Sequence, residues 1–412
     1  MRTVPFAVSA AALLVLVPYA ASAGPVTFDE ALSEASASTP QLQAGALRID
    51  AQQSASISAA ALPDPRVGVA FENFPISGPP AFSLSQDDMT MVTVSASQEI
   101  PSGAKRRARF TRAQADVGEA RAALALITRQ VRVEAALAWL DLAYAERRLA
   151  ALDEGVARIA AYEGTSTSGV ASGTVRPAQS LEVRRAIAIL ADERAELAAH
   201  RGRAAAALTR WTGERDPKTE GPIPAFEVDH HQLMDAIDRL PQLDVASARI
   251  GQAQADIELA RAEKRPDLMV DVAYQRRDPG YGDMISAGVT VSLPLFAGRR
   301  QDPIIAARTA EAGAALAERE DARRSLRAEL ESALADHAMH HDQLGRARST
   351  LLPLARQQSE LETASYAAGR ATLADVIAAR TQLVEAEILL LDREVEVALD
   401  AARLVLTYGD TQ

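Results

Sequence analysis

Three histidines in the segment DHAMHHD are the residues best suited to metal chemistry. His337 and His341 are four positions apart, and His340 is three positions after His337. On a helix these spacings place the imidazoles on one face, where they could share an ion such as zinc. A solvated polar helix face explains the same residues, so both interpretations stay open.

Signatures of catalysis are absent from the sequence. There is no glycine-rich phosphate loop with a lysine, no paired-histidine metalloprotease helix and no convincing nucleophile elbow. The serines and glycines of GTSTSGVASG, which begins at Gly164, lie where a helical hairpin is expected to turn. We therefore expect neither enzymatic activity nor a bound cofactor.

The composition favours long, closely packed helices. Of 412 residues, 48% are hydrophobic but only 4% are aromatic, and none is cysteine. Small side chains suit close helix packing better than the core of a compact enzyme. Without cysteine, disulfides, thiolate metal sites and lipid attachment at a cysteine are excluded. The formal net charge of -11 argues against nucleic acid as a partner.

Residues 1–23 resemble a secretory signal peptide. Arg2 supplies the positive end, an apolar stretch runs from Phe6 to Val17, and the small residues up to Ala23 resemble a cleavage site. We therefore expect an exported protein. No later segment reaches about 18 uninterrupted apolar residues, so membrane-spanning helices are not expected.

The two halves of the chain resemble each other. PQL begins at Pro40 and again at Pro241, each time on the way into a helix. Aligning these prolines brings further residues into register without a gap, which favours two copies of one structural unit. The expected repeats span residues 24–215 and 239–412, with a linker at 216–238.

Each half also contains two segments in which apolar and polar residues alternate. In one of them Val270, Val272 and Tyr274 occupy every second position, which is typical of a strand with one apolar face. Four strands cannot close a barrel, which needs about eight, so other copies of the chain must supply the rest. A β-sandwich patch is the alternative. The strands are expected at about 66–74, 89–99, 267–276 and 284–294.

A long helical stretch follows each strand pair. About 60 residues at about 1.5 Å per residue give a rod of about 90 Å. On the last helix, leucine and valine recur every seven residues from Val376 to Leu404, which favours a coiled-coil seam over an ordinary buried stripe. The long helices are expected at about 104–163 and 303–366, the turns at about 164–177 and 367–373, and the return helices up to about 212 and 408.

This twofold order of helix, strand pair, long helix, glycine turn and return helix resembles the TolC-type outer-membrane efflux protein family. PDPRVGVAFENF, VSASQEIPSGAKRRA and DMISAGVTVSLPLFAGRRQ resemble its branch for cobalt, zinc, cadmium, copper or silver export. The resemblance implies a mostly α fold with a membrane β-barrel. Three chains would contribute four strands each to a twelve-stranded outer-membrane barrel, and their helical hairpins would form a trimeric α-barrel.

The resemblance implies a passive channel through the periplasm, in a tripartite efflux pump that exports heavy-metal cations. The implied partners are a periplasmic adaptor protein, an inner-membrane pump of the resistance-nodulation-division type, outer-membrane lipid and two further copies of the chain. Periodicity alone does not distinguish a trimer from a closed oligomer with another number of chains. A drug-efflux or type I protein-secretion outlet stays open, as does a periplasmic coiled-coil scaffold without a pore.

The resemblance also implies a gate at the helix turns. In the family, a carboxylate six residues after the second-turn glycine narrows the entrance, and Gly369 and Asp375 match these positions. A ring of such carboxylates would select cations. A carboxylate favoured by the helix dipole is the alternative. Tyr366 matches a tyrosine that ties hairpins together, Gln179 is the first-half counterpart of Asp375, and Gly173 is a glycine of the first turn.

Basic residues directly follow the expected strands. Positive charge at a helix N-terminus is unfavourable beside the helix dipole, so an anion should compensate it. We expect phosphates of outer-membrane lipid to supply that anion, with a solvated turn as the alternative. The residues are Lys105, Arg106, Arg107 and Arg109 in the first half, with Arg299 and Arg300 in the second.

Overall fold

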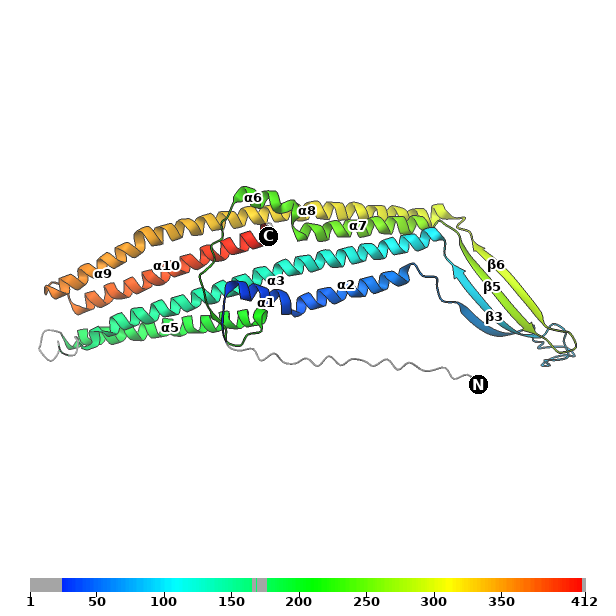
Figure 1. Ribbon diagram of the computed structural model, residues 1–412, viewed down its shortest axis with the longest axis horizontal. Coiled ribbons are helices and arrows are strands. Elements are labelled where there is room, and N and C mark those ends of the chain that lie inside the picture. The colour runs from blue at the N-terminus through cyan, green and yellow to red at the C-terminus, as the bar shows by residue number, and fades with distance from the viewer. Residues whose placement is uncertain (1–23, 165–167, 169–175, 410–412) are drawn as a thin grey trace. The chain divides into compact units, whose positions relative to one another are not determined.

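The computed structural model describes residues 24–164, 168 and 176–409. The chain is mostly helical, with one four-stranded sheet (Figure 1). It forms two compact units, and each unit takes segments from both halves of the sequence. We call them the helical unit, with residues up to 35, 135–224 and 347–395, and the sheet unit, with residues 36–134, 225–346 and 396 onward.

Two helices of the sheet unit start at the prolines that align between the halves. Helix α2 spans Pro40–Ala59 and helix α7 spans Pro241–Ala262. Proline suits the first position of a helix because the missing N–H would have no partner there and its φ is already helical. The repeated PQL motif therefore marks the start of a helix in each half of the chain.

The sheet is antiparallel and has the order β2-β3-β5-β6 (Figure 1). The two halves of the chain meet where β3 pairs with β5. In one row across the sheet, Val69, Val94, Tyr274 and Ile285 are neighbours. They are 71%, 44%, 44% and 76% exposed, so this apolar face is not covered within the chain. The strands span Arg66–Glu72 (β2), Met91–Ile100 (β3), Asp267–Arg276 (β5) and Met284–Ser292 (β6).

Helices pack at one end of the sheet unit's strands. Helix α3 follows β3 and spans Gly103–Ala160, of which residues 103–134 belong to this unit. Helix α8, which spans Gln301–Arg346, lies beside α7 (Figure 1). The short helices are α6 (His230–Ala236), η1 (Ile237–Arg239) and η2 (Ala297–Arg299). A core cluster consists of Leu233, Ile237, Leu240, Leu243, Leu326, Leu330, Leu404 and Tyr408.

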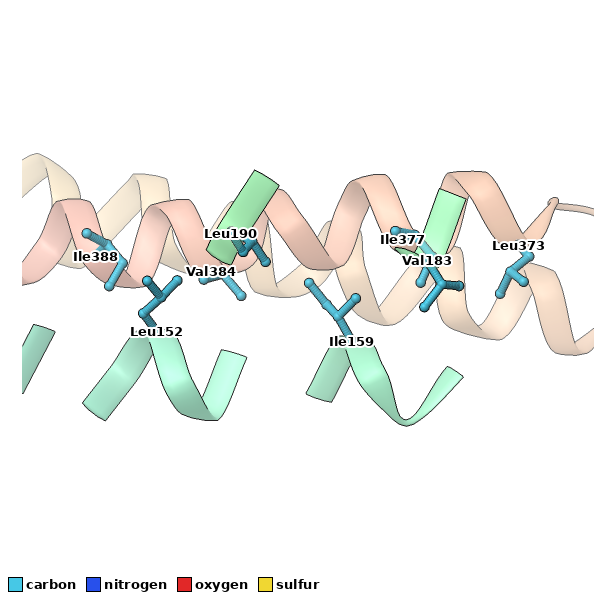
Figure 2. Close-up of a cluster of buried hydrophobic side chains, with 8 residues drawn as sticks. All are labelled: Leu152, Ile159, Val183, Leu190, Leu373, Ile377, Val384 and Ile388. Carbon is cyan, nitrogen blue, oxygen red and sulfur yellow. The ribbon is translucent and has the colours of Figure 1, made fainter. Parts of the chain in front are cut away.

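The helical unit is held by an apolar seam between three helices. Figure 2 shows side chains of α3, α5 and α10 pointing toward one another. Helix α5 spans Pro177–Thr212, and α10 spans Leu373–Tyr408, of which residues 373–395 lie in this unit. The cluster consists of Leu152, Ile159, Val183, Leu190, Leu373, Ile377, Val384 and Ile388. The remaining helices and strands here are α1 (Phe28–Ser38), α9 (Leu352–Ala367) and the parallel pair β1 (Pro25–Val26) and β4 (Lys218–Thr219).

A π-helical turn separates α8 from α9. It spans Ala347–Leu351 and directly precedes the turn that contains Pro353. Proline has no N–H, and its ring clashes with the carbonyl four residues earlier, so the hydrogen-bond ladder must rearrange there. In place of one uninterrupted long helix in the second half, the structure therefore has two helices joined by this turn.

No helix among the described residues is long and apolar enough to cross a membrane. The expected signal peptide and Gly173 lie outside the described residues. The boundaries of the two repeats stay a prediction.

Candidate functional site

The second helix turn depends on Gly369. Helix α9 ends at Ala367, and the N–H of Gly369 donates to the carbonyl of Tyr366 at 2.9 Å. Gly369 has a φ of +73°, in the left-handed region that a side chain disfavours. The glycine therefore ends α9 and lets the chain enter α10 within a few residues.

Asp375 lies in the first turn of α10, where it caps the helix. Its Oδ2 accepts hydrogen bonds from the backbone nitrogen of Thr372 at 2.8 Å and from the Thr372 hydroxyl at 2.7 Å. These bonds, first the backbone one and then the side-chain one, lower the pKa of Asp375 below its usual value. This reciprocal arrangement is a capping box. Within the chain Asp375 thus stabilises a helix start, and its role as a gate stays a prediction.

Gln179 occupies the corresponding position at the start of α5. Its Oε1 accepts a hydrogen bond from the backbone nitrogen of Arg176 at 3.2 Å. Gln179 and Asp375 are therefore both the third residue of a return helix and both reach back to its cap. The two capping side chains differ in charge, because the amide is neutral and the carboxylate is negative.

Tyr366 packs against the apolar seam of the helical unit. Arg380 of α10 contacts α9 and the segment after α3: its Nη2 lies 3.3 Å from the Thr363 hydroxyl and 3.5 Å from the Tyr162 hydroxyl. No local sequence pattern marks Arg380, because these partners are distant from it along the chain. Thr372 could have been found, since Thr-x-x-Asp before an apolar run is a capping signal.

Carboxylates also gather between α5 and α10 in the helical unit. The pKa of Glu193 is raised, first by burial and then by the negative charges of Glu385 and Asp392. A groove of about 350 Å³ between the same two helices is lined by Glu182 and Glu385 and also by Arg185. Arg148 lies 2.8 Å from Asp392, so arginines compensate part of this negative charge.

In the sheet unit, Lys105 is paired within the chain. Only 7% of its side chain is exposed, and its ammonium lies 2.5 Å from Asp267 Oδ2 and 3.0 Å from Glu263 Oε2. Burial alone would lower the pKa of Lys105, but hydrogen bonds to Asp267 and Glu263 raise it overall. The anions that compensate this lysine are therefore carboxylates of its own chain.

The other basic residues surround the same junction of strands and helices. Arg106, Arg107 and Arg109 lie in the first two turns of α3, and Arg107 lines a groove between α3 and α7. Arg299 lies in η2, directly followed by Arg300. Their contact with lipid phosphates stays a prediction.

The structure brings two of the three predicted histidines together. The rings of His337 and His341 are 6.4 Å apart between centroids, whereas His340 Nδ1 lies 2.6 Å from Asp400 Oδ2 on α10. Among the described residues, no group of three or more His, Asp or Glu side chains is arranged to hold a metal ion. The histidine metal site stays a prediction.

The chain is similar to a heavy-metal resistance protein and to two solved structures. It is 26% identical over 379 residues to the cobalt-zinc-cadmium resistance protein CzcC of Cupriavidus metallidurans, which covers 89% of this chain and 86% of CzcC. The fold matches the crystal structure of CusC with a TM-score of 0.75, at 14% identity over 93% of this chain and 92% of CusC. It also matches a membrane protein from Pseudomonas aeruginosa with a TM-score of 0.77, at 17% identity over 93% of each chain.

The family comparison covers both halves of the chain. The outer membrane efflux protein model matches residues 31–214 and 233–410. Each matched range contains one helix–strand–strand–helix series, and the segment between the ranges is left out. This match confirms the resemblance seen in the order of elements and in the quoted motifs. The chain belongs to the outer membrane efflux protein family.

Proposed function

We propose that this protein is the outer-membrane channel of a tripartite efflux pump and that it exports heavy-metal cations. The observation that carries the proposal is the family match over both halves of the chain. The metal specificity rests on the similarity to CzcC, which is named for resistance to cobalt, zinc and cadmium.

We further propose that three chains close a twelve-stranded barrel in the outer membrane. The exposed apolar face of the sheet supports a lipid-facing role. The sheet also has two edge strands, β2 and β6, and an unpaired edge in lipid would cost several kcal/mol for each unsatisfied backbone group. Closure by further copies removes both edges. The helices would then form a trimeric α-barrel in the periplasm that docks on an adaptor protein and an inner-membrane pump.

The barrel can be tested by cross-linking, because the chain has no cysteine of its own. Variants that carry one cysteine in β2 and one in β6 should cross-link between neighbouring chains in outer-membrane fractions and give dimers and trimers on denaturing gels. The matched control moves the β6 cysteine to Ser95 of the central strand β3 and should give no cross-link between chains. Purely monomeric protein for every β2 and β6 pair would refute the closed barrel.

The substrate class can be tested by complementation. A strain that lacks the gene should become sensitive to zinc, cobalt or cadmium, and the parent gene should restore growth. Sensitivity to dyes and antibiotics with normal metal tolerance would instead identify a drug-efflux outlet. A secretion defect with neither sensitivity would identify a protein-secretion outlet. A water-soluble protein without conductance in planar bilayers would leave only the scaffold alternative.

A further inference from the structure

A second basic site lies between the start of α3 and the end of α7 in the sheet unit. There a groove of about 430 Å³ opens between the two helices. Three arginines line it, one from α3, one from the last turn of α7 and one just after α7. These are Arg107, Arg261 and Arg265, and the lining also includes Ala104, Ala108 and Ala262.

The groove has more positive charge than its own residues compensate. Of the described residues that line it, Glu258 is the one carboxylate, and its Oε1 lies 2.6 Å from Nη1 of Arg261. Among the described residues, Arg107 and Arg265 form no ion pair. Lys105 at the same junction is not available to an outside anion, because Asp267 and Glu263 already hold it. Two guanidinium groups are therefore free to bind an anion.

Among charged side chains, arginine matches the geometry of phosphate oxygens best, through its guanidinium group. Their planar set of N–H donors binds two oxygens at once, and such charge-assisted bonds are stronger than neutral ones. The hydroxyl of Thr111 adds a further donor to the lining.

The groove adjoins the apolar face of the sheet. Arg265 is separated from Asp267, the first residue of β5, by a single proline. Leu268 comes next and is 43% exposed on the apolar face. Three residues of extended chain span at most about 11 Å, so Arg265 and the start of that face are within the reach of one lipid molecule. An amphiphile could thus place its charged group at the arginines and its acyl chains along the sheet.

We propose that this groove binds the phosphate of a phospholipid head group through Arg107, Arg261 and Arg265. The site differs from the set of basic residues predicted from the sequence, because Lys105 is excluded and Arg261 and Arg265 are included. A lipid source rests on the outer-membrane placement proposed above. Bound lipid would fix the depth at which the strands leave the membrane and the helices begin.

The test is lipid retention by the full-length protein in a neutral detergent, measured by native mass spectrometry during titration with phosphatidylglycerol. The double variant Arg107→Ala, Arg265→Ala should need about tenfold more lipid for half-saturation, because it loses two charge-assisted contacts. The matched control is Arg48→Ala, Arg249→Ala, which makes the same charge change on exposed residues of α2 and α7 away from the groove and should bind like the parent. Equal binding by parent and double variant would overturn the proposal.

Inorganic phosphate distinguishes the two sources of this chemistry. If the site is built for lipid, millimolar phosphate should not displace phosphatidylglycerol. Displacement by phosphate would overturn the lipid assignment and identify a site for a free anion. Oligomeric state and bilayer conductance of the same samples test the proposed channel separately, since lipid retention in detergent does not require an open pore.

Discussion

The Oδ2 atom of Asp375 lies 2.8 Å from the backbone nitrogen of Thr372 and accepts its hydrogen bond. The carboxylate that the family resemblance places at the gate is thus also part of a helix cap. Thr27 and Glu30 form the same arrangement at the start of α1, with a backbone bond of 2.9 Å, so the geometry alone is not a sign of gating. Charge and capping must be separated by experiment.

Asp375→Asn keeps a hydrogen-bond acceptor for the cap but removes the negative charge. If Asp375 is a gate, this variant should lower cation selectivity in planar bilayers and raise single-channel conductance, as should Asp375→Ala. The control Thr372→Ala weakens the cap and keeps the charge, so it should leave selectivity unchanged. If Asp375→Asn behaves like the parent while Asp375→Ala and Thr372→Ala alter conductance, the gate assignment is wrong and Asp375 only caps α10.

The same carboxylate should not respond to ordinary changes of pH. Its pKa lies below the usual 3.8, because Thr372 stabilises the charged form. A lowered carboxylate pKa gives a contribution that is complete above the unfolded value and lost only as pH falls through the folded value. The selectivity difference between parent and Asp375→Asn should therefore be constant from about pH 5 to about pH 8. A difference that fades toward pH 5 would mean that another group titrates at the gate.

Gly155 should not tolerate a side chain, because α3 and α10 approach closely there. A Cβ at this position would lie 2.5 Å from Cγ2 of Val384. Alanine gains up to about 1 kcal/mol in helix propensity, but overpacking a core costs about 1–3 kcal/mol, so the clash should win. Gly155→Ala should lower the denaturation midpoint of the detergent-solubilised protein.

Gly202 on α5 is the matched control, since no atom lies within 4 Å of its added Cβ. Gly202→Ala should be neutral or stabilising by up to about 1 kcal/mol. Adding Val384→Ala to Gly155→Ala should relieve the clash, so the two changes should be less harmful together than their sum. Strict additivity would show that the two residues do not touch in the assembled protein.

Replacing the buried Lys105 should weaken the junction of strands and helices. Lys105→Met leaves Asp267 and Glu263 without their cation, and breaking such a pair costs about 3 kcal/mol when one carboxylate remains partly solvated. The neighbouring Lys264→Met is the control, because Lys264 and Asp302 are 40% and 50% exposed and such pairs contribute at most about 1 kcal/mol. The temperature at which half of the oligomer is lost on gels measures the effect of each variant. Equal midpoints for Lys105→Met and Lys264→Met would contradict a stabilising role of the buried Lys105 ion pairs.

His337 should make the sheet unit less stable as the pH falls. Burial lowers its pKa most; Asp400 opposes this effect, and His341 and His340 reinforce it. The folded state then favours the neutral ring, so stability is complete above the usual 6.5 and declines as pH falls below it. His337→Gln should lose less stability than the parent between about pH 7.5 and about pH 5.5. Equal losses in the parent and in His337→Gln would contradict the assignment.

Some elements of this fold could be predicted from short stretches of sequence. Pro40 and Pro241 indicate helix starts through their own missing N–H, and the alternation through Val270 and Val272 indicates a strand with one apolar face. Pro353 also marks a break, but the length of the π-helical turn before it depends on how the surrounding ladder relaxes. Such signals involve residues within about four positions of one another, where the backbone geometry of helix and strand is known.

The sequence by itself determined the types of element, their twofold order and the family, because these follow from periodicity and from short motifs. Only the tertiary structure decided that Lys105 meets Asp267, 162 positions away, and that Arg107 faces Arg261 and Arg265 across a groove. The register of β3 on β5 and the packing of α3 against α7 bring these residues together. A contact between distant residues depends on the whole arrangement of elements, and no local pattern of residue types encodes it.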